Sequence, residues 1–108
     1  MKIQHLDFQG SPAIELSTPA MRLVVTTCCG PRIAFLGKPQ GKNLLLWKPG
    51  EHTRNDWDLR GGHRVWMTTP GADECEDTYA TDNQPCTVAI APDGFVVTGA
   101  ENQVNRTR

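Results

Sequence analysis

The sequence has almost no charge imbalance and no long apolar run. Its 108 residues carry 11 basic and 12 acidic side chains, a net charge of -1, with no basic stripe. That balance argues against nucleic-acid binding. No run of about 18 apolar residues is present, so a membrane-spanning helix is not predicted. The first residues, Met1–His5, lack the apolar core of a secretory signal, and we expect a cytoplasmic protein.

The spacing of the cysteines does not match the common metal motifs. The four cysteines are Cys28, Cys29, Cys75 and Cys86, and no Cys-x-x-Cys pair occurs, so we predict no metal and no cofactor. A Cys75–Cys86 bridge is conceivable, although a cytosolic chain would keep both thiols reduced. We expect buried or incidental thiols, with Cys28 and Cys29 on opposite faces of a strand.

Helical periodicity is also missing, and strand patterns take its place. We predict strands at residues 3–8, 13–16, 21–28, 32–36, 43–47 and 62–67. The clearest unit is a hairpin in which 87–91 and 95–98 flank a Pro92-Asp93-Gly94 turn. Residues 48–61 read as a loop with room for one helical turn, and 68–84 as a long irregular stretch. The expected fold is an all-β, antiparallel sandwich with little helix, in one domain.

The segment Gly61-Gly62-His63-Arg64-Val65-Trp66 gathers the side chains best suited to chemistry. If it is extended, His63 lies on one face and Arg64 and Trp66 on the other. A guanidinium that donates to hydroxyls beside an indole that covers a ring fits a sugar site. The alternative is a turn that leads into a strand, with His63 in the core and Arg64 in a salt bridge. Arg32 either points into the same cleft or is an ordinary surface arginine.

An acidic stretch follows, with Asp73, Glu74, Glu76, Asp77 and Asp82 within ten positions. Such carboxylates can hold Ca²⁺ or act as an acid–base pair in glycoside hydrolysis, and a metal-dependent hydrolase is the corresponding function. The spacing of a calcium-binding EF-hand loop is absent. The remaining interpretation is a solvated polar loop.

Four segments in order carry a resemblance to a known family. They are Gly30-Pro31-Arg32-Ile33, Asn43-Leu44-Leu45, Gly61-Gly62-His63-Arg64-Val65-Trp66 and Thr78-Tyr79-Ala80-Thr81-Asp82-Asn83-Gln84-Pro85. Together they resemble the start of proteins similar to aldose 1-epimerases, which have the galactose mutarotase-like fold. That resemblance implies a large antiparallel β-sandwich that binds hexoses on one sheet.

The resemblance also implies roles for individual residues. His63 would be the general acid or a sugar-binding residue, Arg32 and Arg64 would position the sugar, and Asp82 and Asn83 would lie at the pocket rim. An active protein would be an isomerase of the aldose 1-epimerase type. Because the family's glutamate base lies further downstream than this chain reaches, we expect hexose binding rather than catalysis. The alternative is a non-catalytic structural or interaction module.

Residues 1–108 would then form a single domain that corresponds to the N-terminal part of a larger β-sandwich. A partial sandwich leaves apolar sheet and strand edges exposed. The simplest way to cover them is a second copy of the chain, so we predict a homodimer, with a small-molecule sugar as ligand.

Overall fold

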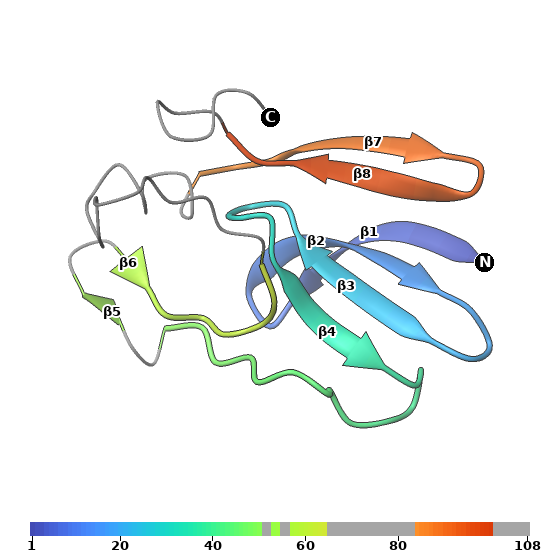
Figure 1. The fold of residues 1–108 in the computed structure, drawn as a ribbon, viewed down its shortest axis with the longest axis horizontal. Helices are drawn as coiled ribbons and strands as arrows, with labels where there is room; N and C mark the ends of the chain where they lie inside the picture. Colours follow the sequence, from blue (N-terminus) through green and yellow to red (C-terminus); the bar gives the residue numbers. More distant parts are fainter. Residues whose placement is uncertain (51–52, 55–56, 65–83, 101–108) are drawn as a thin grey trace, which may run out of the picture.

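All regular structure in the described part of the chain is β-strand. The computed structural model describes residues 1–50, 53–54, 57–64 and 84–100. These ranges form one four-stranded sheet and two two-stranded pairs, every pairing is antiparallel, and no helix occurs in them (Figure 1). The predicted all-β antiparallel fold is therefore confirmed.

The main sheet is a meander in chain order. Its strands are β1 (Lys2–Phe8), β2 (Ser11–Ser17), β3 (Arg22–Thr26) and β4 (Ile33–Gly37). Gln9 and Gly10 join the first two strands with φ angles of 52° and 90°, as a two-residue hairpin turn with left-handed residues requires. In the next turn the Thr18 hydroxyl accepts a hydrogen bond from the Met21 amide at 3.0 Å. Short polar turns thus keep successive strands adjacent.

One face of this sheet carries the aromatic core. Its buried members are Phe8, Ala13, Val24, Ala34, Phe35 and Trp47. Trp47 comes from the chain that runs back after β4, and its ring centroid lies 6.5 Å from that of Phe8. Phe8 and Phe35 meet edge to face at 6.1 Å, an arrangement that aromatic quadrupoles favour. The segment after β4 is therefore pinned to the sheet by an indole.

A charged pair lies on the same face beside the aromatic rings. The Arg22 guanidinium is 4.9 Å from the centroid of the Phe35 ring, and its Nε donates to Glu15 at 2.5 Å. The Gln4 amide donates to the other Glu15 oxygen at 3.0 Å. Burial alone would raise the pKa of Glu15, but these hydrogen bonds and the Arg22 charge together lower it. The carboxylate is thus held ionised inside the sheet.

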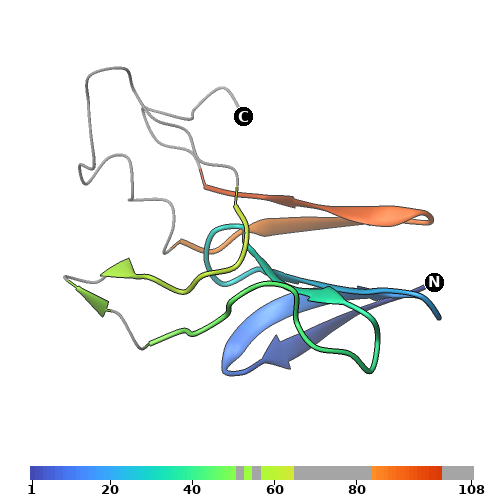
Figure 2. The ribbon, with the colours of Figure 1, turned by 60° about the horizontal axis from the view of Figure 1, so that its bottom comes forward.

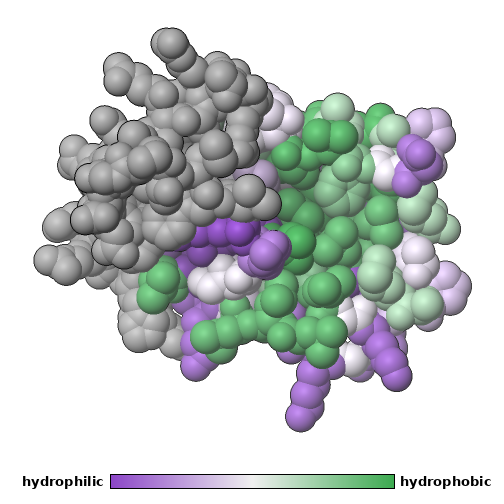
Figure 3. Space-filling view, in the orientation of Figure 1, coloured by the Kyte–Doolittle hydropathy of each residue, from purple (hydrophilic) through white to green (hydrophobic). Residues whose placement is uncertain are grey.

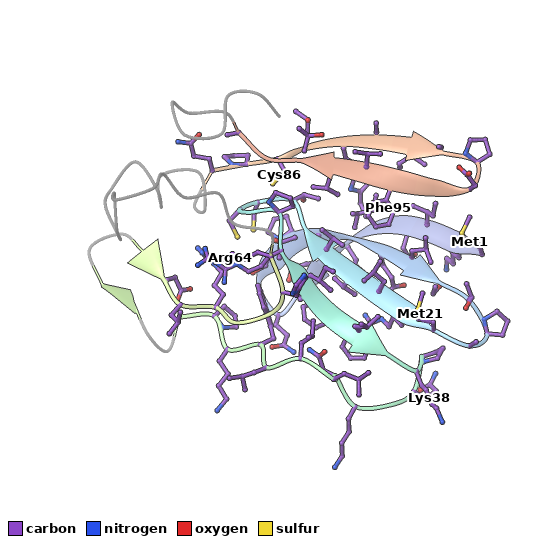
Figure 4. All side chains as sticks on the ribbon, in the orientation of Figure 1. Met1, Met21, Lys38, Arg64, Cys86 and Phe95 are labelled. Carbon is purple, nitrogen blue, oxygen red and sulfur yellow. The ribbon has the colours of Figure 1, made fainter. Side chains whose placement is uncertain are left out.

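The opposite face has an apolar centre and is partly covered by a second layer. Ile14 is fully buried and Val25 nearly so, and they are register partners in β2 and β3. The predicted hairpin is confirmed as β7 (Thr87–Ala91) and β8 (Gly94–Thr98). It runs along one side of the sheet in both ribbon views (Figures 1 and 2), and Phe95 reaches from β8 toward the sheet (Figure 4). The arrangement is sandwich-like.

The predicted strand at residues 43–47 is wrong. Asn43 takes over the hydrogen bonds that a neighbouring strand would make: its amide donates to Ala34 O at 2.7 Å, and its Oδ1 accepts from Leu36 N at 3.2 Å. After Asn43, the backbone makes one hydrogen bond to β4, from Leu44 N to Leu36 O at 2.9 Å. Because the Asn43 side chain, rather than a backbone, makes these hydrogen bonds with β4, residues 43–47 do not add a further strand to the sheet.

Two further predictions need correction. Residues 48–61 are not a plain loop, because β5 (Thr53–Arg54) and β6 (Trp57–Asp58) pair within them. The expected strand over 21–28 ends at Thr26, whose amide bonds to Arg32 O at 2.8 Å across the following loop. Cys28 and Cys29 therefore lie in that loop rather than on opposite strand faces, with their sulfur atoms 3.3 Å apart.

Candidate functional site

The glycine pair is the structural centre of the candidate site. Gly61 and Gly62 have φ angles of 84° and 74°, a region that L-residues with a Cβ rarely adopt. Both also lie against backbone: a Cβ on Gly61 would overlap the Leu46 carbonyl oxygen, and one on Gly62 that of Ile33. Only glycine at both positions lets the backbone pass this close to the Leu46 and Ile33 carbonyl groups. They are not extended, so the expected strand does not begin at Gly62.

Backbone hydrogen bonds fix this segment on both sides. Gly62 N donates to Leu46 O at 2.6 Å, and Lys48 N donates to Arg60 O at 2.8 Å. Ile33 and His63 exchange both their amide bonds, at 2.8 and 2.9 Å. The segment 60–63 thus lies between the chain that follows β4 and the first residue of β4, and the position of His63 is set by backbone contacts.

His63 is exposed in this arrangement. The alternative that placed it in the core is therefore wrong. Its backbone is held in an antiparallel bridge with Ile33, whereas its imidazole is at the surface, where a neutral ring offers one donor and one acceptor. A fixed backbone with an accessible ring is what a ligand-binding histidine needs.

Arg32 supports the site from within. It is only 3% exposed, so the surface interpretation of this arginine is wrong. Its Nη1 donates to Gly61 O at 2.9 Å, and its own amide donates to the Thr26 hydroxyl at 3.1 Å. Burial, followed by the positive charge of Arg60, lowers the pKa of Arg32. The structure brings Arg32 to the glycine pair as a group that positions the backbone.

Arg64 is half-buried and follows His63 directly. In the view of Figure 4 its side chain is seen between β6 and the loop that joins β3 to β4. Of the predicted site residues, Arg32, His63 and Arg64 are thus found around one short segment. Trp66, Asp82 and Asn83 lie outside the described residues, as does the acidic stretch 73–77.

Sequence reasoning missed two residues that shape this region, Asp58 and Arg60. The Arg60 Nε is 3.6 Å from Asp58 Oδ2, and the same carboxylate oxygen accepts the Gly50 amide at 2.8 Å. Asp58 therefore holds together the two ends of the β5–β6 excursion. The sequence did offer one signal for Arg60, its position immediately before the glycine pair.

The described ranges contain no cluster of three or more His, Cys, Asp or Glu side chains placed to hold a metal ion. Among the same residues no helix has the length and apolarity needed to cross a membrane. Comparison of the chain with protein-family models, curated proteins and solved structures gives no match. The site must therefore be interpreted from its own geometry.

Proposed function

We propose that this chain binds a hexose at the surface formed by His63 and Arg64, within a β-sandwich related to the galactose mutarotases. The observation that carries the proposal is the exposed imidazole directly after a glycine pair that is locked by backbone contacts. A sugar presents many hydroxyls in a fixed arrangement, so polar side chains that are already held in place bind it more tightly than mobile ones.

The neighbouring cations support a polar, uncharged or anionic ligand. Arg64 supplies a planar fork of donors, and the buried Arg32 holds the Gly61 carbonyl that precedes His63. Trp66, two residues further on, is the proposed stacking surface for the sugar ring, and Asp82 and Asn83 are the proposed rim. In this proposal His63 donates a hydrogen bond to a sugar oxygen, and the chain binds the sugar rather than isomerising it.

Tryptophan fluorescence during titration with galactose and glucose tests the proposal. We expect a saturable change in the wild-type protein and an affinity roughly five- to thirtyfold lower in His63→Ala and in Arg64→Ala, since each loses a hydrogen bond worth about 1–2 kcal/mol. His5→Ala and Lys42→Ala remove exposed side chains elsewhere and should leave the affinity unchanged. A flat titration of the wild type, or unchanged affinity in both site variants, contradicts the proposal.

Polarimetry separates binding from catalysis. Fresh α-glucose or α-galactose should mutarotate at the buffer rate in the presence of the chain. A faster rate that disappears in His63→Ala would show that His63 acts as an acid with a base elsewhere.

The thiols bear on the compartment. Cys28, Cys29 and Cys86 are free, and a reducing compartment such as the cytoplasm keeps thiols in that state. A cytoplasmic protein is therefore part of the proposal.

A second candidate function is self-association, and the exposed apolar surface favours it. Large apolar side chains with high exposure are Met1, Leu44, Leu46, Leu59, Ile90 and Val96. Figure 3 shows apolar residues gathered in a broad region of one face of the molecule. Contiguous apolar surface on a small soluble domain is typical of a protein–protein contact, and the proposed partner is a second copy of this chain.

A further inference from the structure

The loop between β3 and β4 holds two thiols in direct contact. The sulfur atoms of Cys28 and Cys29 are 3.3 Å apart, close to van der Waals contact. Cys29 is 3% exposed, whereas Cys28 is half-buried and reachable from solvent. One sulfur is thus open to a reagent, and the other is accessible mainly through its neighbour.

The loop backbone keeps this pair in place. The Thr26 hydroxyl donates to Cys29 O at 2.6 Å, and the Cys28 amide lies 3.4 Å from Pro12 O. Thr26 itself is fully buried. Because the chain on both sides of the thiols is tied to the sheet, the two sulfurs do not need a large rearrangement to meet.

We infer that Cys28 and Cys29 form a redox-active dithiol that closes a reversible vicinal disulfide by exchange with small-molecule disulfides. The Cys28 thiolate attacks one sulfur of the reagent, whose S–S bond breaks and releases one thiol. Cys29 then gives up its proton, and its thiolate attacks the Cys28 sulfur and displaces the second thiol. Two protein thiols are oxidised and one reagent disulfide is reduced to two thiols.

The environments of the two sulfurs match these roles. Burial, followed by the hydrogen bond with Cys28, raises the pKa of Cys29 to about 11. Cys29 therefore stays protonated and inert toward outside reagents, while it lies next to the sulfur it has to attack. The half-buried Cys28 is the entry point, and Cys29 is the resolving thiol.

Covalent geometry makes such a bond reversible. The Cα atoms of adjacent residues are about 3.8 Å apart, less than the roughly 4.4–6.8 Å spanned by most disulfides. A bond between neighbours closes a small strained ring, and strained disulfides are the readily reduced ones. The pair is thus suited to a switch rather than to a permanent crosslink.

The loop is also the junction of three parts of the molecule. Thr27 O accepts the Cys86 amide at 2.8 Å at the base of the β7–β8 hairpin, and Gly99 lies against Gly30 and Pro31. Arg32, just after the loop, holds Gly61. A ring closed at Cys28 and Cys29 would shift this junction, so oxidation is expected to change the protection of the Cys86 amide against hydrogen exchange.

Peptide mapping of the intact chain tests the inference directly. The reduced protein is incubated with oxidised glutathione, alkylated and digested with trypsin. Cleavage after Arg22 and Arg32 gives a peptide, residues 23–32, that contains both thiols and neither Cys75 nor Cys86. We expect it unalkylated and lighter by two hydrogens than the reduced peptide, and restored by dithiothreitol. An alkylated peptide, a stable glutathione adduct or a bond to Cys75 or Cys86 would overturn the inference.

Single-thiol variants separate the two roles. Cys29→Ser has no resolving thiol and should accumulate a glutathione adduct on Cys28, whereas Cys28→Ser should leave Cys29 unmodified because it is buried. Phenylarsine oxide, which needs two neighbouring thiols, provides a second probe in a Cys75→Ser/Cys86→Ser background. One equivalent should bind there and none after either further serine substitution. Equal adduct formation on both single-thiol variants would contradict the assignment.

Discussion

At the residue scale, the candidate site depends on two positions where only glycine fits. Gly61 and Gly62 combine positive φ angles with close packing against the carbonyl oxygens of Leu46 and Ile33. Gly10 has a positive φ of 90° but open space around it, and Gly94 has neither constraint. The chain therefore contains its own controls for the two effects, backbone conformation and steric overlap.

We expect Gly62→Ala to destabilise the fold the most in this set. A positive φ costs a residue with a Cβ about 1–2 kcal/mol, and the overlap with Ile33 O adds a further cost of similar size. Gly10→Ala should lose only the first contribution, and Gly94→Ala should change the free energy of unfolding by less than about 0.5 kcal/mol. Urea denaturation followed by tryptophan fluorescence measures the series. Equal stability of Gly62→Ala and Gly10→Ala would show that the close approach has no energetic consequence.

At the element scale, local patterns predicted the strands that pair with a sequence neighbour. The β7–β8 hairpin and the four-stranded meander follow from alternation and turn residues, which act over a few positions. The strand predicted at 43–47 failed because the Asn43 side chain replaces a ladder, a contact between elements that periodicity does not encode. Similarly, the sequence placed Arg32 near the site but could not show that it is buried behind Gly61, since burial depends on which segments meet.

The Glu15–Arg22 pair within the sheet makes stability depend on pH. The folded pKa of Glu15 lies below its ordinary value of 4.5, so the folded state binds the proton less readily than the unfolded chain. The contribution of the ionised Glu15 to the free energy of unfolding is present above about pH 4.5 and is lost as the pH falls through the folded pKa.

We therefore expect Glu15→Gln to lower the free energy of unfolding by about 2 kcal/mol at pH 7, because Arg22 loses the charge that compensates it. The difference from the wild type should shrink as the pH falls below 4. Asp93→Asn, which removes an exposed carboxylate in the β7–β8 turn, is the control. Urea denaturation at a series of pH values measures both variants, and a Glu15→Gln deficit that stays constant down to pH 3 would exclude this role for the ion pair.

At the scale of the whole molecule, the second layer covers only part of the first. The β7–β8 hairpin has two strands against four in the main sheet, and the chain that follows β4 exposes 77% of Leu44 and 69% of Leu46. Both leucines precede the buried Trp47, so exposed apolar side chains lie directly before the residue that anchors this segment to the core. If two copies of the chain packed against each other here, these exposed leucine side chains would be removed from water, which stabilises the association.

We therefore expect the chain to form a homodimer in which Leu44 and Leu46 lie in the interface. Light scattering after gel filtration at micromolar concentration should give twice the 11.9 kDa chain mass. In a two-fold interface each residue occurs twice, so Leu44→Ser/Leu46→Ser removes four leucines. At about 1 kcal/mol each the dissociation constant should rise on the order of a thousandfold. Asp93→Ser, which changes an exposed polar residue in the β7–β8 turn, should leave the dimer intact. A wild-type monomer would mean that the exposed leucines are not a self-association surface.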